Sequence, residues 1–340
     1  MKKKIEIKKQ SNDYLDVRGT FLSLTSKTYP HGHEEEVLRF LPDLKKDEFG
    51  NYYTVVGEDS RTMFTSHLDT ADHRQNTTVR YSELIEGREI ITTDGNSILG
   101  ADDKAGVTVM LYMITKGVPG LYYFFIGEER GGIGSKRLAN EFDDVAHVKN
   151  IVRCVSFDRR STGSVITMQL GRTCCSDTFA NALCVQYNGL GMRMAPDPTG
   201  IFTDSAMLMG NIPECTNISV GYVREHTGEE SQDITHLEKL CAASCKVDWE
   251  SLPVDRDLEA AKKSDGDYPS EYKSLVKDAR KIDSFGGIEE EQYGWSLYFD
   301  IEALKPSDVA KQLQQISDLI DDHRLDSDCY TDNGYLVLPL

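Results

Sequence analysis

The chain has 340 residues, of which 39% are hydrophobic, so it is long enough for one large domain with a buried core and a smaller one. Its formal net charge is −18, from 56 acidic and 38 basic residues, which argues against broad binding to nucleic-acid phosphates. No apolar run approaches membrane-spanning length, and none follows the basic residues at the start, so we expect neither a secretory signal nor a membrane partner.

The eight cysteines follow neither a regular disulfide pattern nor a zinc-knot pattern. Cys174 and Cys175 are neighbours, which rarely pair with each other, and Cys241 and Cys245 have no second Cys or His pair nearby. We therefore expect free thiols and a cytoplasmic protein, because a reducing cytosol keeps thiols unpaired.

The first part of the chain is expected to contain two helices, two strands and a hairpin. The helices are predicted at 12–24, with Tyr14, Leu15, Val17, Phe21 and Leu22 as the apolar face, and at 31–41. The strands are predicted at 52–56 and 62–66, and the hairpin-like excursion at 76–97.

Polar residues follow the second of these strands directly. His67 can bind a metal through one ring nitrogen, and Asp69 can accept a proton from the other nitrogen, which fixes the orientation of the ring. Taken alone, a His–Asp pair on the surface is the simpler interpretation.

An acidic pair, Asp102 and Asp103, lies between Gly100 and Gly106, ahead of apolar residues at helical spacing. An Asp in this position usually caps the helix that follows. The same position can present a carboxylate to a metal, so both interpretations stay open.

The central stretch is an apolar run, 121–126, followed by Glu128, Glu129 and a glycine-rich turn. The run is typical of a buried strand in a parallel sheet, and such sheets bind ligands beyond the carboxyl ends of their strands. One glutamate could bind a metal while the other handles a proton. An ordinary solvated turn is the alternative.

The remaining elements continue to alternate. We expect helices at 134–143, 175–188 and 231–246, a helix start at 202–206, and strands at 151–157 and 215–222. The first of these strands ends at Asp158, and the second leads to His226. Alternation of this kind predicts an α/β fold, a mostly parallel sheet with helices on both faces.

One pocket at an edge of that sheet would gather His67, Asp102, Glu128, Glu129, Asp158 and His226. Two histidines and three carboxylates suit Zn, Mn or Co. The set fits two ions about 3.5–4 Å apart that share a carboxylate and a bridging water. The glutamate that remains would take a proton from that water, which is chemistry for hydrolysing an amide.

The order of these motifs resembles the co-catalytic zinc exopeptidases. The matching segments are His67-Leu68-Asp69, Gly100 to Gly106, Gly127-Glu128-Glu129, Asp158 and His226, within residues 12–246. Within that group the pattern is most similar to the peptidase T, carboxypeptidase G and acetylornithine deacetylase type.

The resemblance implies a role for each site residue. Asp102 would bridge two divalent ions, most simply zinc, although the sequence alone does not separate Asp102 from Asp103. His67 and Asp158 would hold one ion, and Glu129 and His226 the other. Glu128 would be the general base, and Asp69 the orienting partner of His67.

The chain departs from that type in one respect. Its members carry an inserted lid or dimerisation domain after the position of Asp158, and the segment from Asp158 to His226 is too short to hold one. Any oligomer should therefore not be lid-mediated. The glycine-rich segment 127–135 also resembles the lidless aminopeptidases of the same clan, so the branch stays open.

We expect a catalytic domain at 1–249 and a small αβ appendage at 250–340 that begins with a charged linker, 251–268. In the appendage, strands are predicted at 295–301 and 335–338, with a helix between them that has Ser307 as N-cap and Val309, Leu313, Ile316 and Ile320 on one face.

The sequence thus favours a metallopeptidase, an amino- or dipeptidase acting on small peptides. The alternatives are a deacylase of N-acyl amino acids, a one-metal relative such as a glutaminyl cyclase, and a catalytically inactive binding protein on the same fold. Five arginines, Arg130, Arg159, Arg160, Arg172 and Arg224, could each anchor a substrate carboxylate, so the sequence does not choose between the two ends of a peptide.

Overall fold

The structure is a computed structural model that describes residues 2–5, 14–258, 273–279, 281–282, 284–291, 294–300, 306–323, 330–332 and 335–339. The chain divides into two compact units. The larger comprises 1–128 and 134–258, and the smaller groups the turn 129–133 with 259–340. The seven cysteines that lie in the described segments are all free.

The larger unit is built on an eight-stranded sheet with the order β12-β9-β13-β8-β4-β7-β3-β2. Its four inner strands are mutually parallel: β13 (Glu214–Ser219), β8 (Arg153–Arg159), β4 (Thr62–His67) and β7 (Gly120–Phe125). Every residue of β4 and β7 is buried, as expected for strands covered on both faces.

The outer strands are β9 (Ser164–Ile166), β12 (Ala195–Asp197), β3 (Tyr52–Val56) and β2 (Lys45–Lys46). β9 and β3 run antiparallel to the inner strands beside them. The predicted α/β class with a mostly parallel sheet is confirmed.

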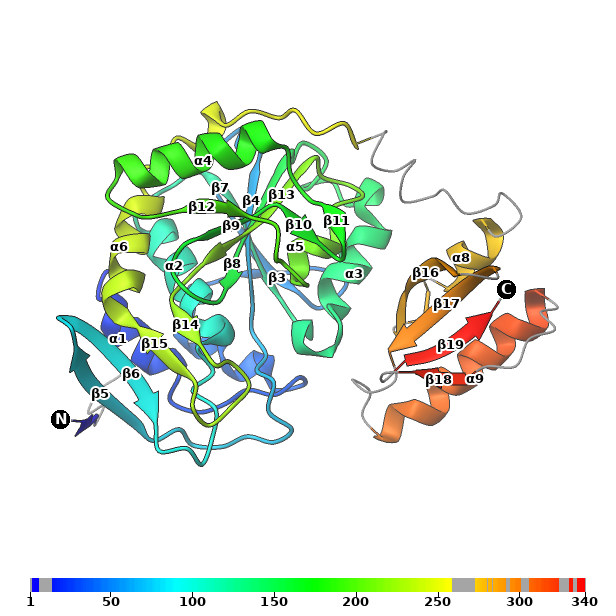
Figure 1. Cartoon of the computed structure of the whole chain (residues 1–340), viewed down its shortest axis with the longest axis horizontal. Coiled ribbons are helices and arrows are strands. Elements are labelled where there is room, and N and C mark those ends of the chain that lie inside the picture. Colours follow the sequence, from blue (N-terminus) through cyan, green and yellow to red (C-terminus); the bar gives the residue numbers. More distant parts are fainter. Residues whose placement is uncertain are drawn as a thin grey trace. The chain divides into compact units, whose positions relative to one another are not determined.

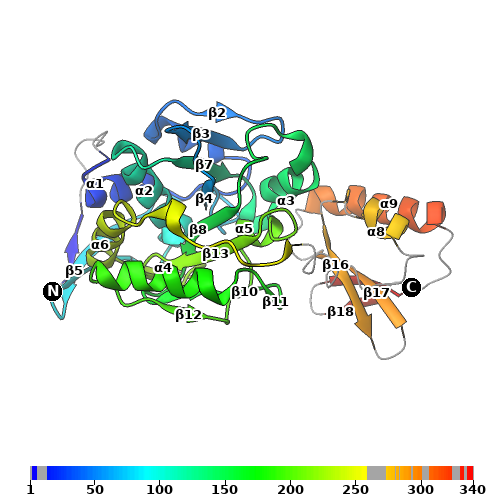
Figure 2. The same ribbon diagram turned by 90° about the horizontal axis from the view of Figure 1, so that it is seen from above.

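Helices cover both faces of this sheet. Figure 2 shows α1 (Val17–Leu24), α2 (Ala101–Thr115) and α6 (Ile234–Ser244) on one side, and α3 (Ile133–Asn140) and α5 (Asp204–Met207) on the other. α4 (Asp177–Gly189) packs against β9 and β12 at the edge. No helix among the described residues is long and apolar enough to cross a membrane.

A second, antiparallel sheet lies beside α1 and α6 (Figure 1). Its order is β1-β5-β6-β15-β14, and the predicted hairpin forms β5 (Arg80–Ile85) and β6 (Arg88–Thr93). The remaining strands are β1 (Lys3–Lys4), β14 (Tyr222–Val223) and β15 (Ser231–Asp233). The loop that carries His226 is therefore held at both ends by β14 and β15.

Some predicted elements differ from the structure. The predicted helix 31–41 is instead two 3₁₀ turns, η1 (Glu34–Glu36) and η2 (Leu38–Phe40). The Glu34 carboxylate accepts hydrogen bonds from the Gly32 N–H and contacts His31, and such local bonds compete with an α-helix. The first helix begins at Val17 with Asp16 as N-cap, and Leu15 is 42% exposed, so it does not belong to the buried face.

Residues 159–225 form no separate inserted domain. They contain β9 to β14, including the small hairpin of β10 (Met168–Gln169) and β11 (Arg172–Thr173), together with α4 and α5. The whole segment belongs to the larger unit. Three further 3₁₀ turns lie in the described part of the chain, η3 (Glu128–Arg130), η4 (Phe142–Asp144) and η5 (Trp249–Ser251).

Within its described residues, the smaller unit has a four-stranded antiparallel sheet with the order β16-β17-β19-β18 and two helices. The strands are β16 (Phe285–Glu291), β17 (Gly294–Asp300), β18 (Tyr330–Asp332) and β19 (Tyr335–Pro339), and the helices are α8 (Lys273–Ala279) and α9 (Pro306–His323). Ile316 is buried as predicted, but Leu313 is 43% exposed, and α9 begins before Ser307. Ile301 and most of the predicted linker lie outside the described residues.

Gly106 allows α2 to approach the sheet closely. A Cβ at this position would lie 1.9 Å from the Phe157 carbonyl oxygen and 2.4 Å from Ser66 Oγ. We expect Gly106→Ala to destabilise the protein by about 1–3 kcal/mol, because the backbone must shift to make room. Gly189→Ala is the control, since nothing lies within 4 Å of its added Cβ. Equal urea midpoints for the two variants would contradict this prediction.

Candidate metal centre

The candidate site residues come from the carboxyl ends of the four parallel strands. His67 ends β4, Glu128 follows β7, Asp158 lies near the end of β8, and His226 lies beyond β13. Because neighbouring parallel strands end at the same edge, these side chains converge there. Asp102 reaches the same point from the start of α2.

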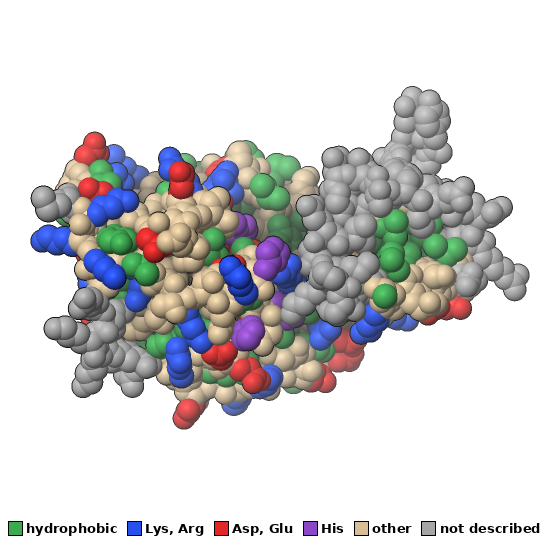
Figure 3. Space-filling view, turned by 90° about the horizontal axis from the view of Figure 1, so that it is seen from below, with side chains coloured by type: hydrophobic (Ala, Val, Ile, Leu, Met, Phe, Trp, Pro, Cys, Tyr) green, Lys and Arg blue, Asp and Glu red, His purple; other side chains and the backbone are tan. Residues whose placement is uncertain are grey.

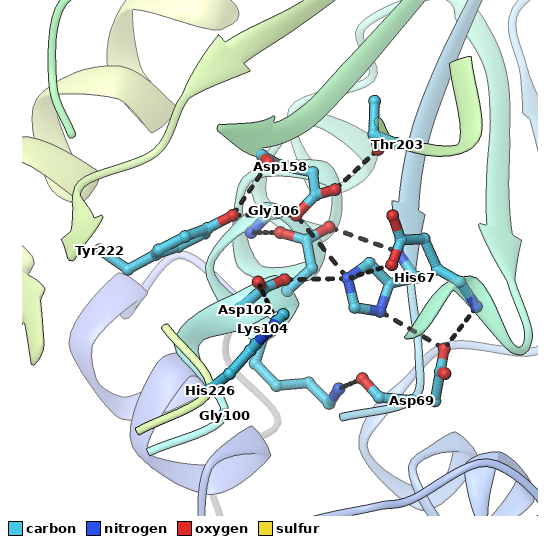
Figure 4. Close-up of polar contacts among 12 residues, drawn as sticks. His67, Asp69, Gly100, Asp102, Lys104, Gly106, Asp158, Thr203, Tyr222 and His226 are labelled. Carbon is cyan, nitrogen blue, oxygen red and sulfur yellow. Dashed lines mark hydrogen bonds and ion pairs between the residues drawn. The ribbon is translucent and has the colours of Figure 1, made fainter. Parts of the chain in front are cut away.

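The carboxylate of Asp102 lies between the two histidines. Its Oδ1 is 2.9 Å from Nε2 of His67, and its Oδ2 is 3.1 Å from Nε2 of His226 (Figure 4). The adjacent Asp103 faces elsewhere, because its two oxygens accept hydrogen bonds from the main-chain N–H groups of His67 and Gly106. The peptide bond between the two aspartates is cis.

Three sets of side chains at this edge place possible ligand atoms within 4.8 Å of one another. One contains His67, Asp102 and Asp158, and another contains Asp102, Glu129 and His226. A third contains His67, Glu128 and Glu129. The first two sets share Asp102, so the structure brings together all five predicted ligands.

Asp158 is held in place by three neighbours. Thr203 donates a hydrogen bond to its Oδ2 at 2.7 Å, and Tyr222 donates to its Oδ1 at 3.1 Å. Asn217 on β13 exchanges hydrogen bonds with the main chain of Asp158 in both directions. These contacts fix the carboxylate toward His67, whose Nε2 is 3.7 Å from Oδ1.

The other side of His67 faces Asp69. Oδ1 of Asp69 lies 3.4 Å from Nδ1 of His67 and accepts a hydrogen bond from the Glu128 N–H at 3.1 Å. The buried Lys104 donates to the carbonyl oxygens of Leu68 and Asp69, which holds this segment against α2. Asp69 therefore contacts both the His67 ring and the main chain of the Glu128 turn.

Burial and neighbouring charges shift the pKa values of the cluster. Burial and the charge of Asp102 raise the pKa of Asp158 to about 6. Burial opposes a charge on His67, but Glu128, Asp102, Asp158 and Asp69 together raise its pKa well above the usual value. Burial also opposes ionised Asp102, yet the two histidines hold its pKa well below the usual range. The four carboxylates therefore favour a positive charge on His67, while Asp102 stays ionised.

These residues fit a metal centre by their donor chemistry. Imidazole nitrogens and carboxylate oxygens are the ligands that zinc, manganese and cobalt take in proteins. The Nε2 atom of His67 faces the carboxylates of Asp102 and Asp158 at 2.9 and 3.7 Å, while its Nδ1 atom faces Asp69. Several buried carboxylates side by side are costly unless a cation compensates them.

Sequence reasoning missed other residues around the site. Glu230 accepts hydrogen bonds from the main chain at Asp102, and Asp204, which is 1% exposed, has its pKa raised to about 8 by burial. Thr203 and Asp204 were predicted only as a helix start, and α5 does begin at Asp204. His31, Glu34 and Asp69 form a further group of close ligand-type atoms, whereas His33 is paired with Glu36 at the surface.

On the face seen from below, the surface of the larger unit has both acidic and basic side chains. Figure 3 shows histidine side chains gathered near its centre, with acidic, basic and hydrophobic side chains mixed around them. His226 is the exposed member of the candidate site, since 49% of its side chain is accessible. The other members are buried or half-buried.

Comparisons with known proteins agree with this architecture. No family model and no curated protein matches the sequence. Among solved structures, aminopeptidase PepT from Bacillus cereus is similar with a TM-score of 0.56 and 16% identity, over 68% of this chain and 97% of that chain. A tripeptidase from Staphylococcus aureus has a TM-score of 0.52 and 16% identity, over 69% and 97%. The TET1 peptidase from Pyrococcus horikoshii has a TM-score of 0.52 and 15% identity, over 68% and 98%.

At this level of identity the comparisons establish the fold. The chain shares the fold of these peptidases, which is what its resemblance to the co-catalytic zinc exopeptidases predicts. Substrate, metal and the role of each residue are separate questions for the site itself.

Proposed function

We propose that the protein is a metal-dependent aminopeptidase or dipeptidase that hydrolyses small peptides with two divalent ions, zinc first and manganese or cobalt as alternatives. The observation that carries the proposal is the Asp102 carboxylate, whose two oxygens face His67 and His226 at 2.9 and 3.1 Å. A carboxylate placed between two histidines in this way is suited to bridge two ions. The likeness to an aminopeptidase and a tripeptidase supports the substrate class.

In this proposal Asp102 is shared by two ligand sets. His67 and Asp158 complete one set, and Glu129 and His226 complete the other. The support is that the ligand atoms of each set lie within 4.8 Å of one another. The contacts of Asp103 with main-chain N–H groups favour Asp102 as the bridging residue.

The bound ions would act as Lewis acids and lower the pKa of a water molecule in the site. Glu128 would accept the proton from the attacking water and deliver it to the leaving amine. Its Oε2 lies 3.9 Å from Nε2 of His67, outside the set formed by Asp102, Glu129 and His226. Asp69 would orient the His67 ring through Nδ1.

Three of the five arginines that could anchor a substrate carboxylate already pair with an acidic side chain. Arg159 lies 3.7 Å from Asp197, Arg160 is 3.3 Å from Glu225, and Arg224 is 2.8 Å from Glu229. Each of these guanidinium groups already has a carboxylate partner, so binding a substrate carboxylate would require it to exchange partners. For these three arginines, the existing pairs argue against a role as the anchor of a carboxypeptidase substrate.

We expect purified protein to bind close to two divalent ions per chain, and chelation to abolish hydrolysis. Elemental analysis after dialysis measures the first, and activity before and after re-addition of zinc, manganese or cobalt measures the second. Full hydrolysis by metal-free protein would contradict the proposal.

A substrate panel separates the proposal from its alternatives. Amino-acid amides and dipeptides should be hydrolysed, and N-acyl amino acids should not. Preference for N-acyl amino acids would identify a deacylase. Two bound ions with no turnover on any of these compounds would favour an inactive binding protein.

A further inference from the structure

Glu230 is a buried carboxylate that bonds to the main chain at the start of α2. Its side chain belongs to a residue that is 1% exposed. Oε2 accepts hydrogen bonds from the N–H groups of Leu99 at 2.7 Å and Gly100 at 2.8 Å, and Oε1 accepts one from Asp102 at 3.1 Å. Three main-chain donors thus converge on one side chain from a segment far away in the sequence.

One of these bonds takes the place of a side-chain cap at Asp102, and the other two hold the residues just before the helix. The N-cap residue of α2 is Gly100, which has a φ of 70° and no side chain to accept a bond from the first turn. The free N–H groups of a first helical turn need acceptors, and an anionic acceptor is favoured there. Glu230 supplies that acceptor from outside the helix, and so it sets the main chain from which Asp102 projects.

Glu230 also closes the loop that carries His226. Its own N–H donates to the Thr227 carbonyl oxygen at 3.1 Å, and β15 begins at the next residue. The same loop is fixed from β6, where Thr93 donates to the Gly228 carbonyl oxygen at 2.9 Å. Half of the His226 side chain is exposed, so its position depends on the loop more than on packing.

We propose that Glu230 is a positioning residue: it holds the main chain at Asp102 and the loop of His226 so that both side chains face one of the two ions. This inference rests on the two-ion site of the proposed function. Because Glu230 joins the main chain at Asp102 to the His226 loop, its loss should act on the ion of the Asp102–Glu129–His226 set. His67 and Asp158 lie on strands β4 and β8, so the other ion should depend on it far less.

Position 230 requires a carboxylate because all three main-chain groups that bond to this side chain are hydrogen-bond donors. In Glu230→Gln one oxygen becomes an NH₂ group that would point at a main-chain N–H, so at least one donor loses its acceptor. Residues that support metal ligands in this way typically change metal affinity about 10- to 100-fold when replaced. We expect the ion of the Asp102–Glu129–His226 set to bind about 10- to 100-fold more weakly in Glu230→Gln, and the ion of the His67–Asp102–Asp158 set to be weakened far less.

The test is a zinc titration by equilibrium dialysis of the full-length protein, with folding checked by circular dichroism. Glu229→Gln is the matched control, because Glu229 is the adjacent residue, its side chain is 75% exposed, and its carboxylate forms an ion pair with Arg224. It should bind both ions like the unmodified chain. In Glu230→Gln, raising free zinc should restore kcat, since the weakened ion is then reloaded.

Equal weakening of both ions, or unchanged binding of both, would overturn the proposal. If Glu230→Gln does not fold, Glu230→Asp tests the same point, because its carboxylate keeps the charge but lies one methylene further from the main-chain donors. The ion of the Asp102–Glu129–His226 set should again be weakened more than the other ion. If the unmodified chain binds no ions, the proposed function fails. If it binds two and the split is absent, only the role of Glu230 fails.

Discussion

Glu128→Gln is expected to lower kcat about a hundred- to ten-thousandfold while both ions stay bound. The amide cannot accept a proton from the attacking water, but it keeps the size and shape of the side chain. Glu128 lies beside His67 and outside the set of Asp102, Glu129 and His226, so no bridging contact is removed. Metal content and kcat, measured on the same preparation, check this prediction.

Glu129→Gln is the matched comparison, because the two residues are adjacent in η3. Its carboxylate lies in the ligand set with Asp102 and His226, so its loss should weaken one ion. Added metal should then restore part of the activity of Glu129→Gln and none of the activity of Glu128→Gln. If added metal instead restores Glu128→Gln and not Glu129→Gln, then Glu129 is the general base and Glu128 is the metal ligand.

Most of the site residues were predicted from one pattern, in which a polar residue follows an apolar strand. His67 and Asp158 follow apolar runs, and parallel strands end at one edge, so their convergence follows from a local pattern and a general rule of α/β sheets. Asp102 could not be separated from Asp103 by sequence. The separation depends on which carboxylate the main chain turns toward Gly106, and that is a property of the folded chain.

Glu230 was missed for a similar reason. Nothing in its neighbourhood in the sequence distinguishes it from the exposed Glu229, because its partners at Leu99, Gly100 and Asp102 are brought to it by the pairing of β15 with β6. The helix predicted at 31–41 is wrong, because Pro42 follows the segment and restricts the residue before it to an extended conformation. Local side-chain bonds then stabilised 3₁₀ turns instead.

Asp102→Asn is expected to abolish the binding of both ions, and with it a larger share of activity than any other single change at the site. The two ligand sets that contain histidine and Asp102 have no other residue in common, so one substitution affects both. The asparagine also turns an NH₂ group toward His67 or His226, where Asp102 now presents oxygens at 2.9 and 3.1 Å. Activity should not recover at high metal concentration.

Thermal unfolding with and without zinc measures this loss independently of turnover. An ion at a hundred times its Kd stabilises the folded state by about 2.7 kcal/mol, so zinc should raise the Tm of the unmodified protein. Asp102→Asn should show no such rise. Asp103→Asn should keep a smaller rise, because the oxygens of Asp103 face the main-chain N–H groups of His67 and Gly106 rather than the ligand atoms, although the new NH₂ group leaves one of these donors without its acceptor. If Asp103→Asn loses the zinc response and Asp102→Asn retains it, then Asp103 is the bridging residue, and the two-ion arrangement must be rebuilt around it.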